Sequence, residues 1–84
     1  MKILLTGGSG YLGSILTRKL LANGHHVRIL DNFLFGKESL KEIQNNKKLE
    51  LVTGDIRDLS IVGKSLKDID SVIHLASIVG TQSA

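Results

Sequence analysis

The sequence predicts an α/β fold in which residues 1–84 form one domain, with a parallel sheet of topology βαβαβαβ and strand order 3-2-1-4. Two observations predict it. Four apolar runs, at 2–6, 26–30, 49–53 and 71–76, have the length of buried strands. The segments between them have the composition and apolar spacing of helices. A chain of 84 residues leaves no room for a second domain.

The first strand, 2–6, reads KILLT and is followed by glycines, as expected for a strand buried on both faces. The first helix is predicted at 11–22, because four apolar residues fall on one helical face and the charged residues fall away from it. Asn23-Gly24 predicts the end of this helix through a left-handed cap. The apolar face consists of Leu12, Ile15, Leu16 and Leu20.

The second strand, 26–30, reads HVRIL. A short polar helix is predicted at 37–46, where Leu40 and Ile43 stand three residues apart. The third strand, 49–53, reads LELVT and is closed by a Gly-Asp pair.

The last predicted helix begins behind Asp58, whose side chain is favourable at a helix N-cap. Leu59, Val62 and Leu66 follow at i, i+3 and i+7, which predicts that they form the buried face. The fourth strand is predicted at 71–76, which reads SVIHLA.

Composition excludes several classes of protein. Hydrophobic residues make up 42% and charged residues 23%, which is typical of a folded domain rather than a disordered chain. There is no Cys, so disulfides and thiolate metal sites are excluded. We see no apolar run long enough for a membrane span and no secretory leader, and we therefore expect a cytoplasmic protein without a membrane partner.

The net charge is +3, and all of the positive excess lies in residues 1–36. The cations are scattered and aromatic residues are scarce, so the chain lacks the basic, stacking surface that binds nucleic acids. No nucleic-acid partner is predicted, and the basic residues are interpreted as a solvated surface.

The segment TGGSGYLG, at 6–13, joins the first strand to the first helix and has the spacing G-x-x-G-x-x-G. Gly7 allows a tight turn out of the strand, Gly10 lets a pyrophosphate approach the backbone, and Gly13 lets the helix pack close to the sheet. Free backbone N–H groups and the helix dipole favour an anion at this point. The N–H groups concerned are those of Gly10, Tyr11 and Leu12.

An acid stands where such a site needs one. Asp31 lies 18 residues after Gly13, at the end of the second strand. A carboxylate there accepts hydrogen bonds from both ribose hydroxyls and repels a 2′-phosphate, so the predicted cofactor is NAD rather than NADP. Lys37 leaves an opening for the phosphorylated cofactor, and Asp31-Asn32 is alternatively a simple turn. Strand, glycine loop, helix and acid together predict a Rossmann-type NAD-binding domain.

Two other kinds of glycine loop can be compared with these residues. A phosphate-binding P-loop needs Lys where Ser14 stands, so an NTPase is not predicted. An S-adenosylmethionine methyltransferase also uses a glycine turn and an acid after its second strand, and this alternative stays open.

No metal site is predicted. His25 and His26 lie in the turn that enters the second strand, away from the ligand crevice, and are interpreted as solvated. His74 lies within the fourth strand and is interpreted as a core histidine rather than a catalytic one.

Four motifs occur together and in order: TGGSGYLG at 6–13, Asp31-Asn32, GDIRD at 54–58 and IHLAS at 73–77. This set resembles the extended short-chain dehydrogenase/reductases, and among them the NAD-dependent nucleotide-sugar epimerase/dehydratase branch. The pattern is similar to the amino-terminal part of UDP-glucose 4-epimerases and covers essentially the whole chain.

The resemblance implies roles for particular residues. Asp31 and Asn32 hold the adenosine ribose, and the segment 33–36 wraps it. Asp55 accepts a hydrogen bond from the adenine amino group, and Ile56 packs against the ring. The full set of cofactor-binding residues that it implies is Gly7, Gly10, Tyr11, Leu12, Gly13, Asp31, Asn32, Gly36, Asp55, Ile56, Leu75, Ala76 and Ser77.

The last three of these residues, Leu75, Ala76 and Ser77, line the path of the pyrophosphate and the nicotinamide ribose in this interpretation. Alternatively, Leu75-Ala76 is plain sheet core and Asp55 belongs to a Gly-Asp turn. All the implied residues lie at the carboxyl ends of strands, where open α/β sheets bind ligands.

Two departures from the family leave the substrate open: Val79 stands where many epimerases carry Lys, and the chain reads HLAS where many relatives read HLAA. The family's catalytic Tyr-x-x-x-Lys is absent, since the only Tyr is Tyr11 and Ile15 stands four residues later. No catalytic residue is therefore predicted, and the 84-residue chain is expected to be inactive by itself.

The resemblance implies that the chain is the amino-terminal part of a longer enzyme, which transfers a hydride between a carbon of a nucleotide sugar and NAD. The other interpretations are a non-catalytic dinucleotide-binding or redox-sensing module and a truncated gene without function. An open edge at the fourth strand and an uncovered sheet face indicate self-association, so a homodimer is a further expectation.

Overall fold

The computed structural model describes residues 1–7, 10–33 and 38–75. Its four strands form one parallel sheet in the order β3-β2-β1-β4. This confirms the predicted α/β fold and strand order. The strands are β1 (Lys2–Thr6), β2 (His26–Asp31), β3 (Leu49–Thr53) and β4 (Ser71–His74). The helices are α1 (Tyr11–Ala22), the 3₁₀ helix η1 (Glu38–Leu40) and α2 (Leu59–Ser65).

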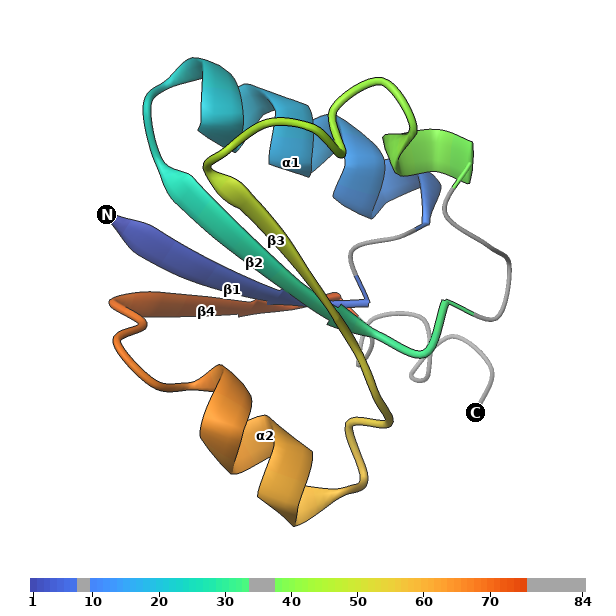
Figure 1. Ribbon diagram of the computed structural model, residues 1–84, viewed down its shortest axis with the longest axis vertical. Coiled ribbons are helices and arrows are strands. Elements are labelled where there is room, and N and C mark those ends of the chain that lie inside the picture. The colour runs from blue at the N-terminus through green and yellow to red at the C-terminus, as the bar shows by residue number, and fades with distance from the viewer. Residues whose placement is uncertain (8–9, 34–37, 76–84) are drawn as a thin grey trace.

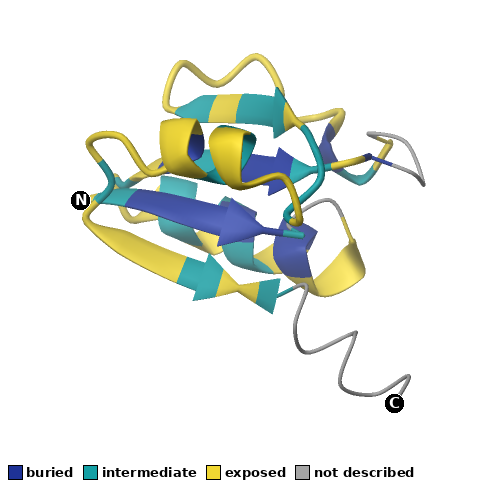
Figure 2. Ribbon diagram, turned by 90° about the horizontal axis from the view of Figure 1, so that it is seen from below, coloured by how far each residue is buried: buried dark blue, intermediate teal, exposed yellow. Residues whose placement is uncertain are grey.

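The sheet lies between two helical layers. Helix α1 and η1 cover one face, and α2 lies on the other (Figure 1). Strand β1 pairs with β2 on one side and β4 on the other, and its side chains from Ile3 to Thr6 are buried. The edge strands β3 and β4 are only partly buried (Figure 2). The position of β1 explains why its sequence is a continuous apolar run rather than an alternating one.

The core consists of β1 and β2 packed under α1. A cluster of buried residues is formed by Leu5, Val27, Ile29, Phe33 and Leu40. Leu16, Leu20 and Leu21 of α1 pack against it. The order of strands and the core therefore place the loops that follow β1, β2 and β3 side by side at the carboxyl edge of the sheet.

Helix α1 has the predicted bounds, but only half of its predicted apolar face is confirmed: Leu16 and Leu20 pack against the core, and Leu12 and Ile15 do not. Leu12 is 67% exposed and Ile15 is also exposed, whereas Gly13, Ser14 and Thr17 are buried. The first half of the helix turns its small residues toward the sheet, because small side chains let the helix approach it closely. The predicted left-handed cap is confirmed, since Gly24 has φ 85° and its N–H donates to Leu21 O (3.0 Å).

One buried hydroxyl on α1 has no hydrogen-bond partner. Thr17 is 0% exposed, and its Oγ1 is unpaired within the described part of the chain. A buried polar group without a partner lowers stability by its desolvation cost. We expect Thr17→Val, which keeps the shape, to raise the free energy of unfolding by about 1 kcal/mol.

Thermal unfolding checks this prediction, because about 1 kcal/mol corresponds to about 4–8 °C in Tm for a domain of this size. Thr53→Val, at an exposed position of β3, serves as the matched control and should change stability by less than about 0.5 kcal/mol. A lower Tm for Thr17→Val would mean that the hydroxyl has a partner in solution.

The polar helix predicted at 37–46 is wrong. Within 38–46, the part of this range that the structure describes, only Glu38–Leu40 is helical, as the 3₁₀ turn η1, and hydrogen-bonded turns follow it. These turns close through i to i+3 bonds, such as Ile43 N to Leu40 O (3.0 Å) and Asn46 N to Ile43 O (2.9 Å). Asn46 also accepts a hydrogen bond from Lys48 N (2.8 Å), and such local side-chain bonds compete with helix formation. Leu40 and Ile43 still reach the core, because a spacing of three suits a 3₁₀ turn as well as an α-helix.

Helix α2 has the predicted N-cap, but the predicted buried face is wrong. Asp58 accepts hydrogen bonds from Ser60 N (3.0 Å) and Ile61 N (3.4 Å). Leu59 is 84% exposed and Leu66 is also exposed, while Ser65 is buried. The helix turns Ile61 and Ser65 toward the sheet, because the contact with β2 decides its rotation and the spacing of its leucines does not.

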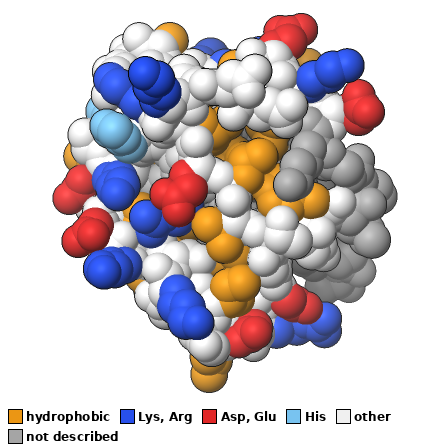
Figure 3. Space-filling view, in the orientation of Figure 1, with side chains coloured by type: hydrophobic (Ala, Val, Ile, Leu, Met, Phe, Trp, Pro, Cys, Tyr) orange, Lys and Arg blue, Asp and Glu red, His pale blue; other side chains and the backbone are white. Residues whose placement is uncertain are grey.

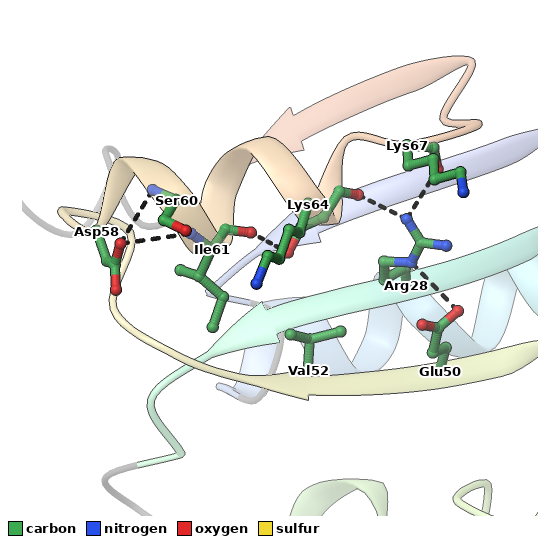
Figure 4. Close-up of a pocket in the computed structure, with 9 residues that line it drawn as sticks. Arg28, Glu50, Val52, Asp58, Ser60, Ile61, Lys64 and Lys67 are labelled. Carbon is green, nitrogen blue, oxygen red and sulfur yellow. Dashed lines mark hydrogen bonds and ion pairs between the residues drawn. The ribbon is translucent and has the colours of Figure 1, made fainter.

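A groove with a volume of about 490 Å³ lies between α2 and the face of β2 and β3 (Figure 4). Arg28 of β2 spans it: its Nη1 donates to Ser65 O (2.7 Å) and Lys67 O (3.0 Å) at the end of α2. Its Nε forms an ion pair with Glu50 Oε1 (3.2 Å) without hydrogen-bond geometry.

Apolar side chains gather in the middle of the molecular face seen in Figure 3, and charged side chains surround them. The groove is lined by Arg28, Glu50, Val52, Asp58, Ser60, Ile61, Lys64, Ser65 and Lys67.

Arg28 therefore ties the end of α2 to the sheet. We expect Arg28→Met, which keeps the aliphatic stem, to lower the free energy of unfolding by about 1–3 kcal/mol, because two carbonyls lose a charged donor. Urea unfolding measures this loss. Arg18→Met is the control: Arg18 donates to Ser39 O (3.0 Å) and pairs with Glu42 (3.3 Å), but it is more exposed. An equal loss in both variants would show that the contacts of Arg28 are not special.

Strand β4 is shorter than the predicted strand at 71–76. It ends at His74, Leu75 follows outside the strand, and Ala76 lies beyond the described residues. The prediction that His74 is a core histidine is wrong, because its side chain is exposed on the edge strand. The ring is held in place by a hydrogen bond between its Nδ1 and Thr6 Oγ1 of β1. Among the described residues, no helix has the length and apolarity needed to cross a membrane.

Candidate functional site

Three loops meet at the carboxyl edge of the sheet. The register aligns Thr6 with Leu30 across β1 and β2, and Asp31 with Thr53 across β2 and β3. The loops are joined by backbone hydrogen bonds, from Gly7 N to Leu30 O (2.9 Å) and from Gly54 N to Asp31 O (2.9 Å). The first residues after β1 and β3, Gly7 and Gly54, are therefore held against the end of β2.

These loops enclose a pocket with a volume of about 140 Å³. Its lining combines one residue of the glycine loop with the segments that follow β2 and β3. The lining residues are Gly7, Leu30, Asp31, Asn32, Gly54, Asp55 and Ile56. Five of the residues implied by the family resemblance, Gly7, Asp31, Asn32, Asp55 and Ile56, thus lie together although 49 positions separate the first from the last.

The glycine loop leads from β1 into α1. Gly7 has φ 77°, a left-handed conformation that glycine adopts without strain. Gly10 is the N-cap of α1, with extended backbone, and a Cβ built on it would meet no atom of the described residues within 4 Å. The N–H groups of the first turn have no partner within a helix, and their N-cap, Gly10, has no side chain that could accept from them. The loop can therefore present backbone donors to an anion.

The side chains around these donors leave the space beside Gly10 open. Tyr11 is 75% exposed and Leu12 is exposed too, so neither side chain is held in the core. Gly13 is buried against the sheet, as predicted from its role in close helix packing. Gly8 and Ser9 lie outside the described residues.

Asp31 stands at the end of β2 and is half-buried. Its Oδ1 accepts a hydrogen bond from Phe33 N (2.8 Å), which anchors one oxygen of the carboxylate to the turn after β2. Phe33 has φ 54°, a conformation that bulky residues rarely adopt, and burial of its ring in the core holds it there. Because that ring is buried, only the backbone of Phe33 can face a ligand, and Gly36 lies outside the described residues.

Asp55 follows β3 and is bound closely by Arg57. Asp55 Oδ1 accepts from Arg57 N (2.8 Å) and Nε (3.1 Å), and Oδ2 accepts from Nη2 (2.7 Å) and Nε (3.1 Å). These hydrogen bonds, first from the side chain and then from the backbone of Arg57, lower the pKa of Asp55 to about 2. The carboxylate is therefore ionised at neutral pH and acts only as an acceptor.

Gly54 is a site residue to which the sequence motifs assigned no role. A Cβ at Gly54 would lie 2.3 Å from Ile61 Cδ1 and 3.2 Å from Ile61 Cγ1. Any other residue at this position would require the side chain of Ile61 to move, so glycine leaves room for α2 to pack beside the end of β3. The GDIRD motif contains Gly54, but the contact with Ile61 could not be derived from it.

The residues implied after β4 do not line this pocket or lie outside the described part of the chain. Leu75 follows β4 and is half-buried. Thr6 and His74, which the sequence reasoning did not assign to the site, are linked at the same sheet edge. Ala76 and Ser77 lie outside the described residues.

Comparison with known proteins identifies the family. The family model described as NAD dependent epimerase/dehydratase family matches residues 3–84. The chain belongs to this family.

Several members of the epimerase/dehydratase family are similar to the chain in sequence or structure. It is 40% identical to a UDP-glucose 4-epimerase of Klebsiella pneumoniae, over 93% of the chain and 60% of that protein. An epimerase of Methanothermobacter thermautotrophicus is 39% identical, with a TM-score of 0.77 over 88% of the chain and 22% of that structure. A dTDP-glucose 4,6-dehydratase of Streptomyces venezuelae, solved with NAD bound, is 32% identical, with a TM-score of 0.80 over 88% of the chain and 26% of that structure.

This member of the epimerase/dehydratase family is short compared with its relatives. It spans between 17% and 60% of the length of the curated relatives that it matches. The matched part begins at β1 and includes the glycine loop and the segments after β2 and β3, so the family relationship covers the pocket described above.

Proposed function

We propose that this chain binds NAD at the carboxyl edge of its sheet. The observation that carries the proposal is the pocket in which Gly7, Asp31 and Asp55 meet from the ends of three different strands. An open α/β sheet binds its ligand at this edge, and the three residues have the chemistry of a dinucleotide site. The family and the NAD-bound relative support the same cofactor.

Each part of the cofactor has a candidate partner. The backbone N–H groups of Tyr11 and Leu12 would bind the pyrophosphate, because they are at the start of α1. Asp31 and Asn32 would hold the adenosine ribose, and Asp55 with the neighbouring Ile56 would hold adenine. NAD supplies a hydride acceptor when it is bound, and the residues of this chain bind and orient it.

We further propose that the chain is the amino-terminal, NAD-binding part of a nucleotide-sugar epimerase or dehydratase. Two facts support this: the chain spans only part of its relatives, and it contains no Tyr-x-x-x-Lys, since Ile15 stands four residues after its only tyrosine. A reading frame that continues beyond Ala84 and encodes Tyr-x-x-x-Lys is the expected result. A complete frame without this motif would overturn the enzyme assignment.

Cofactor binding is tested by titrating the ¹⁵N-labelled chain with NAD, NADP and S-adenosylmethionine and following the amide resonances. We expect NAD to shift the resonances of the glycine loop and of the segments after β2 and β3, with weaker binding of NADP. No shift at millimolar NAD would refute the proposal. A response to S-adenosylmethionine alone would indicate a methyltransferase.

The second candidate is a non-catalytic module that binds the dinucleotide and senses its redox state. The pocket formed by Gly7, Asp31 and Asp55 would serve this function equally, because binding a dinucleotide needs no catalytic residue. A natural stop codon after Ala84, together with different affinities for NAD and NADH, would support this function over the enzymatic one.

A further inference from the structure

The contacts between Asp55 and Arg57 are more extensive than a surface ion pair needs. Arg57 is 87% exposed, and exposed pairs contribute little to stability. Yet its backbone N–H and its guanidinium both bind the same carboxylate, at four distances between 2.7 and 3.1 Å. These contacts therefore act mainly on the orientation of Asp55, which lines the pocket.

The two kinds of contact fix different rotations. The backbone N–H of Arg57 holds Oδ1, but the last torsion of an aspartate is broad and one bond leaves the carboxylate plane free to turn. The guanidinium contacts both oxygens as a planar fork, and this fixes the plane. Together they give the carboxylate one orientation before any ligand arrives.

The contacts with Arg57 also determine how many further hydrogen bonds the Asp55 carboxylate can accept. A carboxylate has about four acceptor positions. Three N–H groups, those of the backbone nitrogen, Nε and Nη2 of Arg57, occupy three of them, with Nε shared between the two oxygens. Among the described residues this leaves one acceptor position, on a side chain that is 44% exposed and lines the pocket. The pKa of Asp55, lowered to about 2, keeps this group ionised, so it can only accept a hydrogen bond.

We propose that Arg57 is a positioning residue that selects the base of the cofactor, by holding Asp55 so that its one remaining acceptor position meets a 6-amino purine and rejects a 6-oxo purine. This inference rests on the proposed binding of NAD. A 6-amino group donates a hydrogen bond to the carboxylate, whereas a 6-oxo group brings a second acceptor against it. The selection follows from the orientation of Asp55, since Arg57 itself need not touch the base.

The test uses NAD and nicotinamide hypoxanthine dinucleotide, which differ only in the 6-amino and 6-oxo groups of the base. For the unchanged chain we expect NAD to bind about 10-fold more tightly or better, as for a site built to pair with a donor. Arg57→Gln should weaken NAD and reduce this ratio to within about 3-fold, because the plane of the carboxylate is no longer fixed. Arg57→Lys should give an intermediate ratio, since an ammonium has no planar fork.

Lys64→Gln is the matched control. It also removes one positive charge, but Lys64 belongs to α2 and lines the groove around Arg28 rather than the pocket. It should leave the ratio unchanged. The pKa of Asp55, followed by the NMR shift of its carboxyl carbon, is a readout that needs no ligand. In Arg57→Gln this pKa should rise from about 2 toward the ordinary 3.8. In the unchanged chain, where the pKa is low, the ion pair that orients Asp55 is fully present above pH 3.8 and is lost as the pH falls through about 2.

The outcomes separate this inference from the proposed function. If the unchanged chain binds NAD selectively and Arg57→Gln keeps both the ratio and the low pKa, the role of Arg57 is refuted and NAD binding stands. Tighter NAD binding in Arg57→Gln would likewise refute it, since Arg57 would then compete with adenine. If the unchanged chain binds neither dinucleotide, the proposed function fails and this inference fails with it.

Discussion

Replacing Gly10 with alanine is expected to weaken NAD binding by at least about 10-fold while the fold stays intact. The backbone of Gly10 is extended, so any residue can adopt it, and a Cβ at this position meets no atom of the described chain within 4 Å. The protein therefore does not need glycine here for its own packing. In the proposed site this open space is where a phosphate approaches the first turn of α1, and a methyl group would keep the phosphate away from the N–H groups. Valine should weaken binding further.

Gly63→Ala is the matched control for Gly10→Ala. It adds the same methyl group, also with no atom within 4 Å, but on α2 and away from the pocket. Amide NMR spectra report folding and binding in the same titration. We expect native-like spectra for both variants and the loss of NAD binding only for the Gly10 variant. Equal NAD affinity in the two variants would mean that the phosphate does not lie beside Gly10.

Asp31→Asn is expected to change the choice of cofactor. An amide keeps the oxygen that accepts from Phe33 N (2.8 Å), so the turn after β2 should be preserved. It loses the negative charge, and a charge-assisted hydrogen bond to a ribose hydroxyl is worth about 1.5–3 kcal/mol. NAD should therefore bind about 10- to 100-fold more weakly, while NADP loses its electrostatic repulsion. The ratio of the two dissociation constants measures the effect.

A suitable control for this charge change is Asp68→Asn. Asp68 is exposed, has φ 63°, and lies between α2 and β4, and asparagine tolerates this left-handed conformation well. Asp68→Asn changes the net charge by the same amount as Asp31→Asn, but it should leave the preference for NAD over NADP unchanged. If the two variants shift the preference by the same amount, Asp31 acts only through net charge and does not contact the ribose.

Much of the fold could be predicted because the signals are local. The apolar run of β1, the glycines after it and the cap at Gly24 each specify a conformation within a few residues. The alternation of strands and helices then limits the order of the sheet, since crossovers are right-handed. The failure at 37–46 has a local cause too: the turns around Asn46 compete with a helix that has only two apolar residues.

The candidate site was predictable as a list of residues but not as an arrangement. The spacing of the glycine loop and the acid at Asp31 indicated a dinucleotide, and the structure brings Gly7, Asp31 and Asp55 to one pocket. The contact between Gly54 and Ile61, and the fork of Arg57 on Asp55, have no periodic or compositional signal. They depend on how two segments pack or on which rotamer a long side chain adopts.

The sequence by itself determined the class of fold, the bounds of β1, α1 and β3, and the position of the glycine loop, because each follows from hydrogen bonding and apolar patterning along the chain. Only the tertiary structure decided which faces of α1 and α2 are buried, that His74 is exposed on an edge strand, and that Arg57 holds Asp55. The physical reason is that periodicity gives the direction of a side chain relative to its own helix axis. The rotation and depth of that helix are fixed by close packing against segments distant in sequence.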